Sequence, residues 1–334
     1  MKSTSRLERS DRGFTLIESL VTMVIVGIAF VVFVGGMGTA IIASDVHRKE
    51  AVSDAAVRNL AEAVKASDYV DCATPDAYGS SAASPFTGTN AFVAPSVHSL
   101  DSGAQLLTFF AVAASTSFTA PAGMTKQYDD ASSGSSNAVT AAMADQPLAD
   151  AGATGTRPAT ALASGDGAAQ AFAFDGFHGA GGIQLHGVAH GHSTTTTLAL
   201  PAPVGATNGD VLIAQIVVRD PTTTVTPPTG WTLLKATAVG ASLKSLIYQG
   251  SLASRTSLRW TLSAAKESAG GVAAYTGFSA YTTAVTKVLY WNGSTFPDPP
   301  TTCTTDQGLQ LVHLHISTAD RRGLADVDLV KRKP

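Results

Sequence analysis

The chain has 334 residues, of which 45% are hydrophobic and 14% are charged. It is long enough for a membrane segment and two or three modest domains, and this composition excludes a disordered protein. The formal net charge is -3, and no run of Lys or Arg alternates with aromatic side chains, so the electrostatic signature of a nucleic-acid-binding protein is missing.

The first predicted element is a long apolar segment that begins at Phe14. It follows a short polar stretch, residues 1–13, and no charged residue occurs between Glu18 and Asp45. This segment exceeds the roughly 20 residues that cross a bilayer as a helix. The positive balance of residues 1–13 favours a cytoplasmic N-terminus. In a secretory signal peptide the cleavage site follows the apolar segment, whereas here the candidate site, after Gly13, precedes it.

The stretch RGFTLIESL, residues 12–20, resembles the processing signal of type IV prepilins and of the related pseudopilins. The resemblance implies that a prepilin peptidase cuts after Gly13 and methylates the new amino group of Phe14. It also implies that Glu18 meets the N-terminal amine of a neighbouring subunit, because an ionised carboxylate among lipids is costly unless it is paired. The alternative is a plain signal anchor in which Glu18 snorkels to the membrane interface.

The segment that follows, residues 45–66, is charged and has apolar residues at helical spacing. One long helix is therefore predicted over residues 14–70, with residues 14–44 embedded in the membrane. The later, amphipathic half of this helix is expected to pack on a globular domain.

The end of the chain predicts a small antiparallel sheet, because apolar and polar residues alternate there. Its strands are expected at residues 288–291, 308–316 and 325–330. A helix followed by such a sheet is the layout of a pilin head, which we assign to residues 71–82 and 282–334. His313 and His315 alternate on the second strand, and we expect them to face solvent beside Asp or Thr.

The chain contains two cysteines, Cys72 after the predicted helix and Cys303 before the last strands. Because two cysteines in an exported chain usually pair, we expect a disulfide between Cys72 and Cys303. The alternative is a pair of unbonded, buried thiols.

The region between the two parts of the head contains an internal repeat. The stretch LDSGAQLLTFFAVAASTSFTAPAGMTKQYD aligns with ATNGDVLIAQIVVRDPTTTVTPPTGWTLLK, and in both a Gly turn leads through an apolar strand to Pro, Gly and a large residue, Met124 or Trp231. Two all-β sandwich modules, residues 83–177 and 178–281, are therefore predicted. They would be inserted in an exposed loop of the head.

Together these elements predict an α+β protein. A long N-terminal helix, first transmembrane and then amphipathic, would pack on a small antiparallel β-sheet pilin head, and two all-β sandwich modules would be inserted in that head.

Catalytic chemistry is not indicated by any motif. No nucleophile elbow and no phosphate-binding loop is found, so we expect no enzyme and no cofactor. One stretch, FHGAGGIQLHGVAHGHS, offers imidazoles that could bind Zn²⁺: His178, His186, His190 and His192. The alternative, which we favour, is a Gly/His-rich surface loop without metal, because no Asp, Glu or Cys follows Asp175 in that stretch.

Aromatic residues of the second module allow two interpretations. Trp231, Trp260, Tyr248 and Tyr275 would stack on sugar rings if they are exposed, or fill the core if they are buried. We expect them in the core.

The sequence predicts a structural subunit of a type IV pilus-like filament, with the inserted modules acting in adhesion or surface display. Their bulk would crowd a thin filament, which favours a minor or tip subunit. The expected partners are prepilin peptidase, other pilins, the membrane and surface glycans or host ligands, without nucleic acid. The chain would lie in the cytoplasmic membrane before assembly and at the cell surface afterwards. The alternatives are a pseudopilin of a type II secretion or DNA-uptake system and a membrane-anchored carbohydrate-binding or enzymatic β-protein.

Overall fold

The structure is a computed structural model of the chain. It describes residues 17, 19–30, 58, 61, 64–65, 69, 71–73, 78–79, 81–99, 102–133, 136–174, 182–251, 257–278, 281–296, 307–318 and 323–333. The chain divides into two compact units, Met1–Val52 and Ser53–Pro334.

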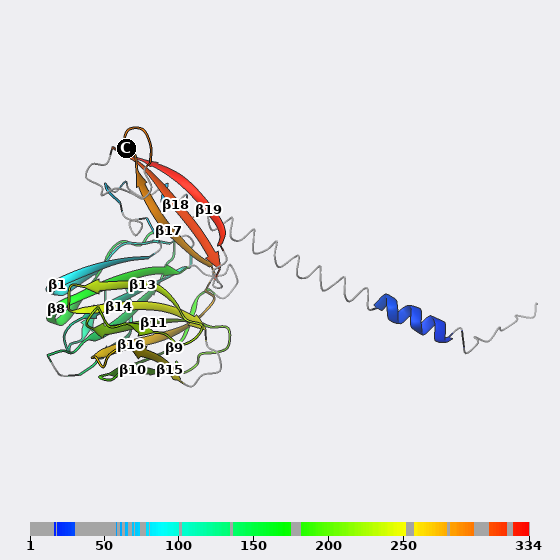
Figure 1. Ribbon diagram of the computed structural model, residues 1–334, viewed down its shortest axis with the longest axis horizontal. Helices are drawn as coiled ribbons and strands as arrows, with labels where there is room; N and C mark the ends of the chain where they lie inside the picture. The colour runs from blue at the N-terminus through cyan, green and yellow to red at the C-terminus, as the bar shows by residue number, and fades with distance from the viewer. Residues whose placement is uncertain are drawn as a thin grey trace, which may run out of the picture. The chain divides into compact units, whose positions relative to one another are not determined.

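The described part of the chain is mainly β, with strands β1–β19 (Figure 1). The predicted α+β class with a long N-terminal helix is therefore wrong. Described helical residues are limited to 17 and 19–30 in the first unit and to 58, 61 and 64–65 in the second. The physical reason is that the inserted region is far larger than the head, and its apolar runs form strands that are buried on both faces. Within the described residues, no helix is both long and apolar enough to span a membrane.

The first module forms one sheet in the order β1-β8-β3-β6-β5, with β4 paired to β8. A separate two-stranded sheet joins β2 and β7. The strands are β1 (Ser81–Ala94), β2 (His98–Ser99), β3 (Gln105–Val112), β4 (Phe118–Thr119), β5 (Thr125–Ala131), β6 (Thr140–Pro147), β7 (Gly152–Ala153) and β8 (Arg157–Phe174).

The second module has the same strand order, β9-β16-β11-β14-β13, and a separate sheet β10-β15-β12. The strands are β9 (Gln184–Ser193), β10 (Thr197–Pro201), β11 (Val211–Arg219), β12 (Val225–Thr226), β13 (Thr232–Val239), β14 (Leu243–Ser251), β15 (Ser257–Leu262) and β16 (Ser268–Thr276). The long strand β1 of the first module thus corresponds to β9 and β10 together. The long strand β8 corresponds to β15 and β16 together.

A β-bulge occurs at equivalent places in the two modules. It directly precedes Tyr128 in β5 and Lys235 in β13, and these two residues pair with Met143 and Ile247 on the equivalent strands β6 and β14. A bulge is a specific local feature of a strand pair, so its repetition supports the internal repeat independently of the sequence alignment.

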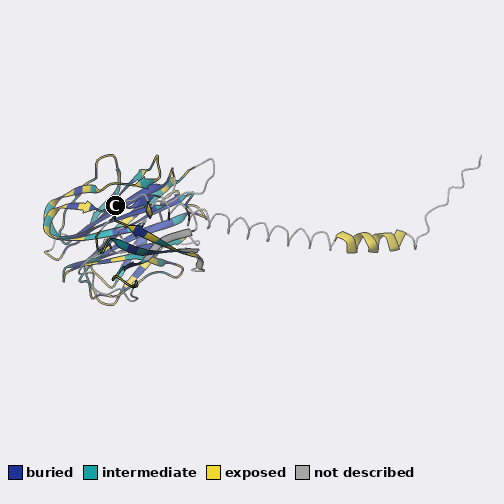
Figure 2. Cartoon of the chain, turned by 90° about the horizontal axis from the view of Figure 1, so that it is seen from above, coloured by how far each residue is buried: buried dark blue, intermediate teal, exposed yellow. Residues whose placement is uncertain are grey.

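The large sheets of the two modules pack face to face. Leu107 and Phe109 on β3 share a buried cluster with Ile213 and Val217 on β11. The alternate residues of β3 and β11 face the other way, into a separate core within each module. Both faces of these central strands are therefore buried. Figure 2 colours buried residues dark blue, and many of the strand residues of the modules have this colour.

The insertion begins and ends at the same end of the strands, where β1 starts and where β8 and β16 finish. Ser81 at the start of β1 pairs with Phe172 on β8. The ring of Phe174 stacks on that of Phe278 with 4.8 Å between centroids, and Phe278 lies just before the last sheet. Neighbouring entry and exit points are what insertion into a loop requires. The boundary between residues 177 and 178 falls outside the described residues and stays a prediction.

The C-terminal strands form a three-stranded antiparallel sheet, β17-β18-β19. These strands are β17 (Tyr281–Tyr290), β18 (Leu309–Thr318) and β19 (Gly323–Arg332), which confirms the strands predicted for the head. Val288, Val312 and Leu314 of this sheet form a buried cluster with Val64, a helical residue, and with Tyr78.

Candidate functional site

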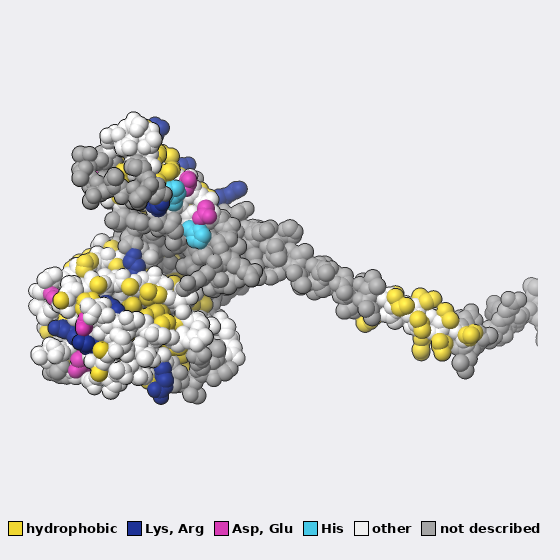
Figure 3. All heavy atoms as spheres, in the orientation of Figure 1, with side chains coloured by type: hydrophobic (Ala, Val, Ile, Leu, Met, Phe, Trp, Pro, Cys, Tyr) yellow, Lys and Arg dark blue, Asp and Glu magenta, His cyan; other side chains and the backbone are white. Residues whose placement is uncertain are grey.

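The predicted processing and assembly residues, Gly13, Phe14 and Glu18, lie outside the described residues. The neighbouring residues 19–30 are helical, and their surface is mainly hydrophobic (Figure 3). The exposed apolar side chains of this helical stretch and of residue 17 are Ile17, Leu20, Val21, Met23, Val24, Ile25, Val26, Ile28 and Phe30. A helix that is apolar all round needs a membrane or other helices around it.

Cys72 lies in a turn and has a φ of 53°, an uncommon backbone conformation for a residue other than glycine. Cys303, its predicted partner, lies outside the described residues. The predicted disulfide between Cys72 and Cys303 therefore stays a prediction.

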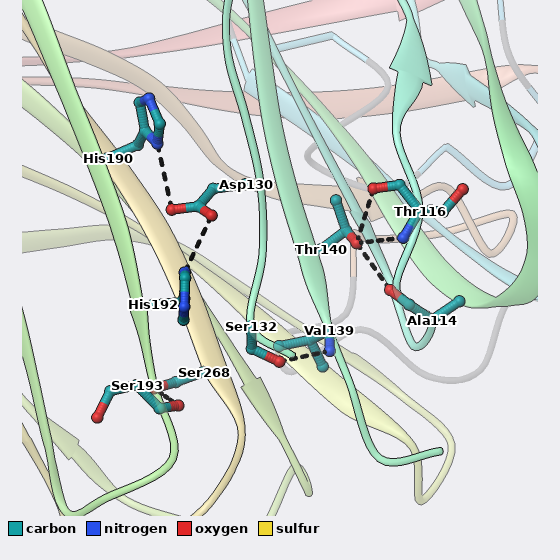
Figure 4. Close-up of polar contacts among 10 residues, drawn as sticks. All are labelled: Ala114, Thr116, Asp130, Ser132, Val139, Thr140, His190, His192, Ser193 and Ser268. Carbon is teal, nitrogen blue, oxygen red and sulfur yellow. Dashed lines mark hydrogen bonds and ion pairs between the residues drawn. The ribbon is translucent and has the colours of Figure 1, made fainter. Parts of the chain in front are cut away.

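The prediction of a Gly/His-rich surface loop is wrong for the described part of that stretch, because Gln184–Ser193 form strand β9, paired with β16. Two imidazoles of this strand contact one carboxylate of the other module. His190 Nδ1 lies 3.2 Å from Asp130 Oδ2, and His192 Nδ1 lies 3.1 Å from Asp130 Oδ1 (Figure 4). Asp130 belongs to β5, so this contact joins the edge strands of the two facing sheets. The two imidazoles approach different oxygens. In the described part of the chain, no group of three or more His, Cys, Asp or Glu is arranged to hold a metal ion.

His186, on the same strand, contacts a different carboxylate. Its Nδ1 lies 2.8 Å from Oδ2 of Asp210, which is buried and also accepts a hydrogen bond from the backbone N–H of Thr207. Burial acts to raise the pKa of Asp210, but the hydrogen bonds from Thr207 and His186 outweigh it and lower the pKa. His186 therefore fixes the loop before β11. The fourth predicted histidine, His178, lies outside the described residues.

The histidines of the head face Asp, as predicted. His313 Nδ1 contacts Asp328, and His315 Nδ1 lies 2.7 Å from Asp326 Oδ1. Each pair lies directly opposite in the register of β18 and β19. Cross-strand side-chain pairs that hydrogen-bond to each other support a hairpin, so these contacts have a structural role.

The four aromatic residues of the second module are buried, which confirms the prediction that they belong to the core. The rings of Trp231 and Trp260 meet edge to face with centroids 5.1 Å apart. Burial raises the pKa of Tyr248 to about 12. Burial and the nearby Asp145 carboxylate, 2.7 Å from the Tyr275 hydroxyl oxygen, raise the pKa of Tyr275 as well.

Sequence reasoning did not find Asp130 as the partner of the histidines. Asp130 lies 60 residues before His190, in the other copy of the repeat. The contact depends on the face-to-face packing of the two modules, which places β5 beside β9. No sequence motif indicates that packing.

Comparison with known families gives one result. Residues 9–42 match the model of the prokaryotic N-terminal methylation motif. No curated protein and no solved structure matches the chain. The matched stretch contains Gly13, Phe14 and Glu18, on which the resemblance to prepilins was based. The chain therefore carries a type IV pilin-like prepilin cleavage and methylation signal, which implies processing by a prepilin peptidase and assembly with other pilins.

Proposed function

We propose that the protein is a minor or tip subunit of a type IV pilus-like filament, and that its inserted modules act in adhesion or surface display. The observation that carries this proposal is the match of residues 9–42 to the N-terminal methylation motif. Cleavage after Gly13 would leave an apolar N-terminal segment that holds the subunit in the membrane and later among other subunits. In this proposal the protein has no enzymatic activity and no cofactor.

The inserted modules support the display role through their packing. They share one buried cluster and their entry and exit lie together, so they form a single body attached at one edge. A body of this size on every subunit would interfere with close helical packing along a filament. This supports a minor or terminal position.

The assembly role is tested by Glu18→Ala, with Ser19→Ala as the matched control. If Glu18 compensates the N-terminal amine of a neighbouring subunit, Glu18→Ala abolishes incorporation into filaments while the chain is still inserted in the membrane. The readouts are immunoblots of sheared filaments and of the membrane fraction. Normal assembly of Glu18→Ala would contradict the proposal and favour a membrane anchor that carries a β-protein.

The same motif occurs in pseudopilins, so a secretion or DNA-uptake role is the second candidate. The location of the assembled protein distinguishes the two. A surface filament that can be sheared from cells and contains the chain supports the pilus. Retention of the assembled chain in the cell envelope supports the pseudopilin.

A further inference from the structure

Strand β2 joins the first module to the segment that leads from the head into the insertion. The backbone N–H of His98 on β2 donates to the Gly79 carbonyl oxygen at 3.3 Å. The adjacent Tyr78 belongs to the buried cluster of the head, and its hydroxyl donates to Gln310 Oε1 of β18 at 2.9 Å. His98 therefore lies at a junction between the head and the first module.

This junction is at the head-side end of the modules, the end of their strands at which the insertion begins and ends. The first residue of β3, Gln105, pairs with Phe174 at this end. The last residue of β3, Val112, pairs with Gly167 at the opposite, distal end, next to Asp166. The junction and the turn of Asp166 are therefore separated by the length of a strand.

The imidazole of His98 is buried, and one of its nitrogens is unpaired. The residue is 8% exposed, and its Nδ1 has no hydrogen-bond partner among the described residues. Protonation gives both ring nitrogens an N–H group, so a proton on His98 would add a charged donor to a site that lacks a described acceptor for Nδ1. An unpaired charge in a buried position is costly.

A second buried cation adds to this cost. The ammonium of Lys331 on β19 is buried in the head and lies over the Tyr78 ring, 5.2 Å from its centroid. Tyr78 directly precedes Gly79, to which His98 is hydrogen-bonded. Burial, and then the charge of Lys331, lowers the pKa of His98 from its ordinary value of 6.5.

The other elements around β2 carry few titratable groups. Its partner β7 consists of Gly152 and Ala153, and Asp150 in the bend before β7 is exposed. On β8 the guanidinium of Arg157 donates to Gln146 Oε1, and Asp166 lies at the distal end. The carboxylates of β19, Asp326 and Asp328, contact histidines of β18. Within the described residues, the charge that acts on His98 is therefore that of Lys331.

We propose that His98 is a pH-sensitive switch, which holds the first module to the head while its imidazole is neutral and opens this junction when the imidazole is protonated. In the open junction the imidazole reaches water and titrates with its ordinary pKa, which is higher than in the closed junction. The closed junction is therefore fully stable above about pH 6.5 and is weakened as the pH falls toward the lowered pKa of His98. Opening leaves both parts folded, and it does not depend on the filament role.

The test is hydrogen exchange of the full-length chain in detergent, measured by mass spectrometry at pH 7.5 and pH 5.5. Conversion to protection factors removes the intrinsic effect of pH on exchange. The informative amides are those of His98 and of Thr154, which donates to the Val97 carbonyl oxygen at 2.9 Å. Strands β3 and β11 are the internal reference. Asp166, whose pKa is lowered, stays ionised in this range.

Two variants remove the titrating group. His98→Phe cannot be protonated and is apolar, as the buried site favours, and His98→Gln is a smaller neutral replacement in case the phenyl ring does not fit. His315→Gln is the matched control, because it removes a histidine of the head that contacts Asp326 and lies in a different part of the sheet. Thermal unfolding of each variant confirms that it is folded.

The opening constant of the junction is expected to rise about two- to tenfold from pH 7.5 to pH 5.5 in the native chain and in His315→Gln. It should stay constant in both His98 variants. The inference is overturned if the native junction opens equally at both pH values, if the His98 variants show the same rise, or if β3 and β11 lose protection to the same degree. NMR titration of the native imidazoles decides independently of any variant, since a His98 pKa of 6.5 or higher would also overturn it.

Discussion

At the scale of single residues, Lys331 holds the end of the helical segment against the head sheet. Its buried ammonium donates to the carbonyl oxygens of Val64, at 2.6 Å, and Lys65, at 3.4 Å. It also lies over the Tyr78 ring, 5.2 Å from the centroid. The last carbonyls of a helix have no partner within the helix, so a cation placed there satisfies them and complements the helix dipole.

We predict that Lys331→Met lowers the free energy of unfolding of the head by about 1–3 kcal/mol, because buried carbonyl oxygens lose a charged donor. Lys333→Met is the control, since Lys333 forms an exposed ion pair with Asp71 and should contribute less than about 1 kcal/mol. Urea unfolding of both variants measures the difference. Equal effects would show that Lys331 does not have this role.

Asp166 links the modules at their distal end. Its carboxylate accepts hydrogen bonds from the Ser242 hydroxyl of the second module and from the Gly88 N–H of the first. The Ser242 hydrogen bond, then that of Gly88, lowers the pKa of Asp166 from its ordinary value of 3.8. A carboxyl group with a lowered pKa in the folded state stabilises the protein above its ordinary pKa and loses that contribution as pH falls.

The contact between Asp166 and Ser242 is therefore expected to weaken below about pH 4. Ser242→Ala should raise the pKa of Asp166 and reduce the loss of stability between about pH 5 and pH 3. NMR titration of the carboxyl group, together with melting temperatures across this range, measures both effects. A pKa of Asp166 that does not change in Ser242→Ala would refute this explanation.

At the scale of strands, Gly271 on β16 allows the first module to approach the second. A Cβ at this position would lie 2.5 Å from Cε1 of Tyr128, whose buried ring belongs to β5. The Tyr128 hydroxyl donates to Gln215 Oε1 at 3.2 Å, which fixes the ring across the interface. The close approach of the sheets at this point therefore requires glycine.

Gly271→Ala is predicted to destabilise the inserted modules by about 1–3 kcal/mol, because the new methyl group overlaps a ring that cannot move away. Gly191→Ala on the adjacent strand is the control, since its Cβ would lie 3.4 Å from Leu200 Cδ2, close to an ordinary contact distance. Chemical denaturation compares the two variants. A Gly271→Ala protein as stable as Gly191→Ala would show that the interface is loosely packed.

The sequence predicted the individual strands better than their packing. The alternation of apolar and polar residues, together with turn residues, located the strands of the head. The repeated Pro and Gly residues before Met124 and Trp231 located equivalent strands in the two modules. The apolar run of β3 predicted a strand, but it could not show that the second module covers one of its faces. For the same reason the contact of Asp130 with His190 and His192 was not predictable, because it depends on packing between distant segments.

At the scale of the whole molecule, the inserted modules are expected to unfold as one unit. Their largest buried cluster draws on both sheets. A chain of buried hydrogen bonds also crosses the interface, from Gln215 to Ser245 at 3.3 Å, from Ser245 to Gln170 at 2.7 Å and from Gln170 to Thr237 at 3.0 Å. Separation of the modules would expose apolar surface and leave these polar groups unpaired, which is costly.

Scanning calorimetry is predicted to show one transition for the inserted modules, and hydrogen exchange should give similar opening free energies for the β3 and β11 amides. Two well-separated transitions, one for each copy of the repeat, would show that the shared cluster does not couple them.

The central claim is that the chain is a processed pilin-like subunit, and the most direct test is the mass and N-terminal sequence of the protein isolated from the cell envelope. The motif match at residues 9–42 predicts a mature chain that begins with N-methylated Phe14. A chain that still begins with Met1, in cells with an active prepilin peptidase, would contradict the claim and leave Glu18 without an assembly role.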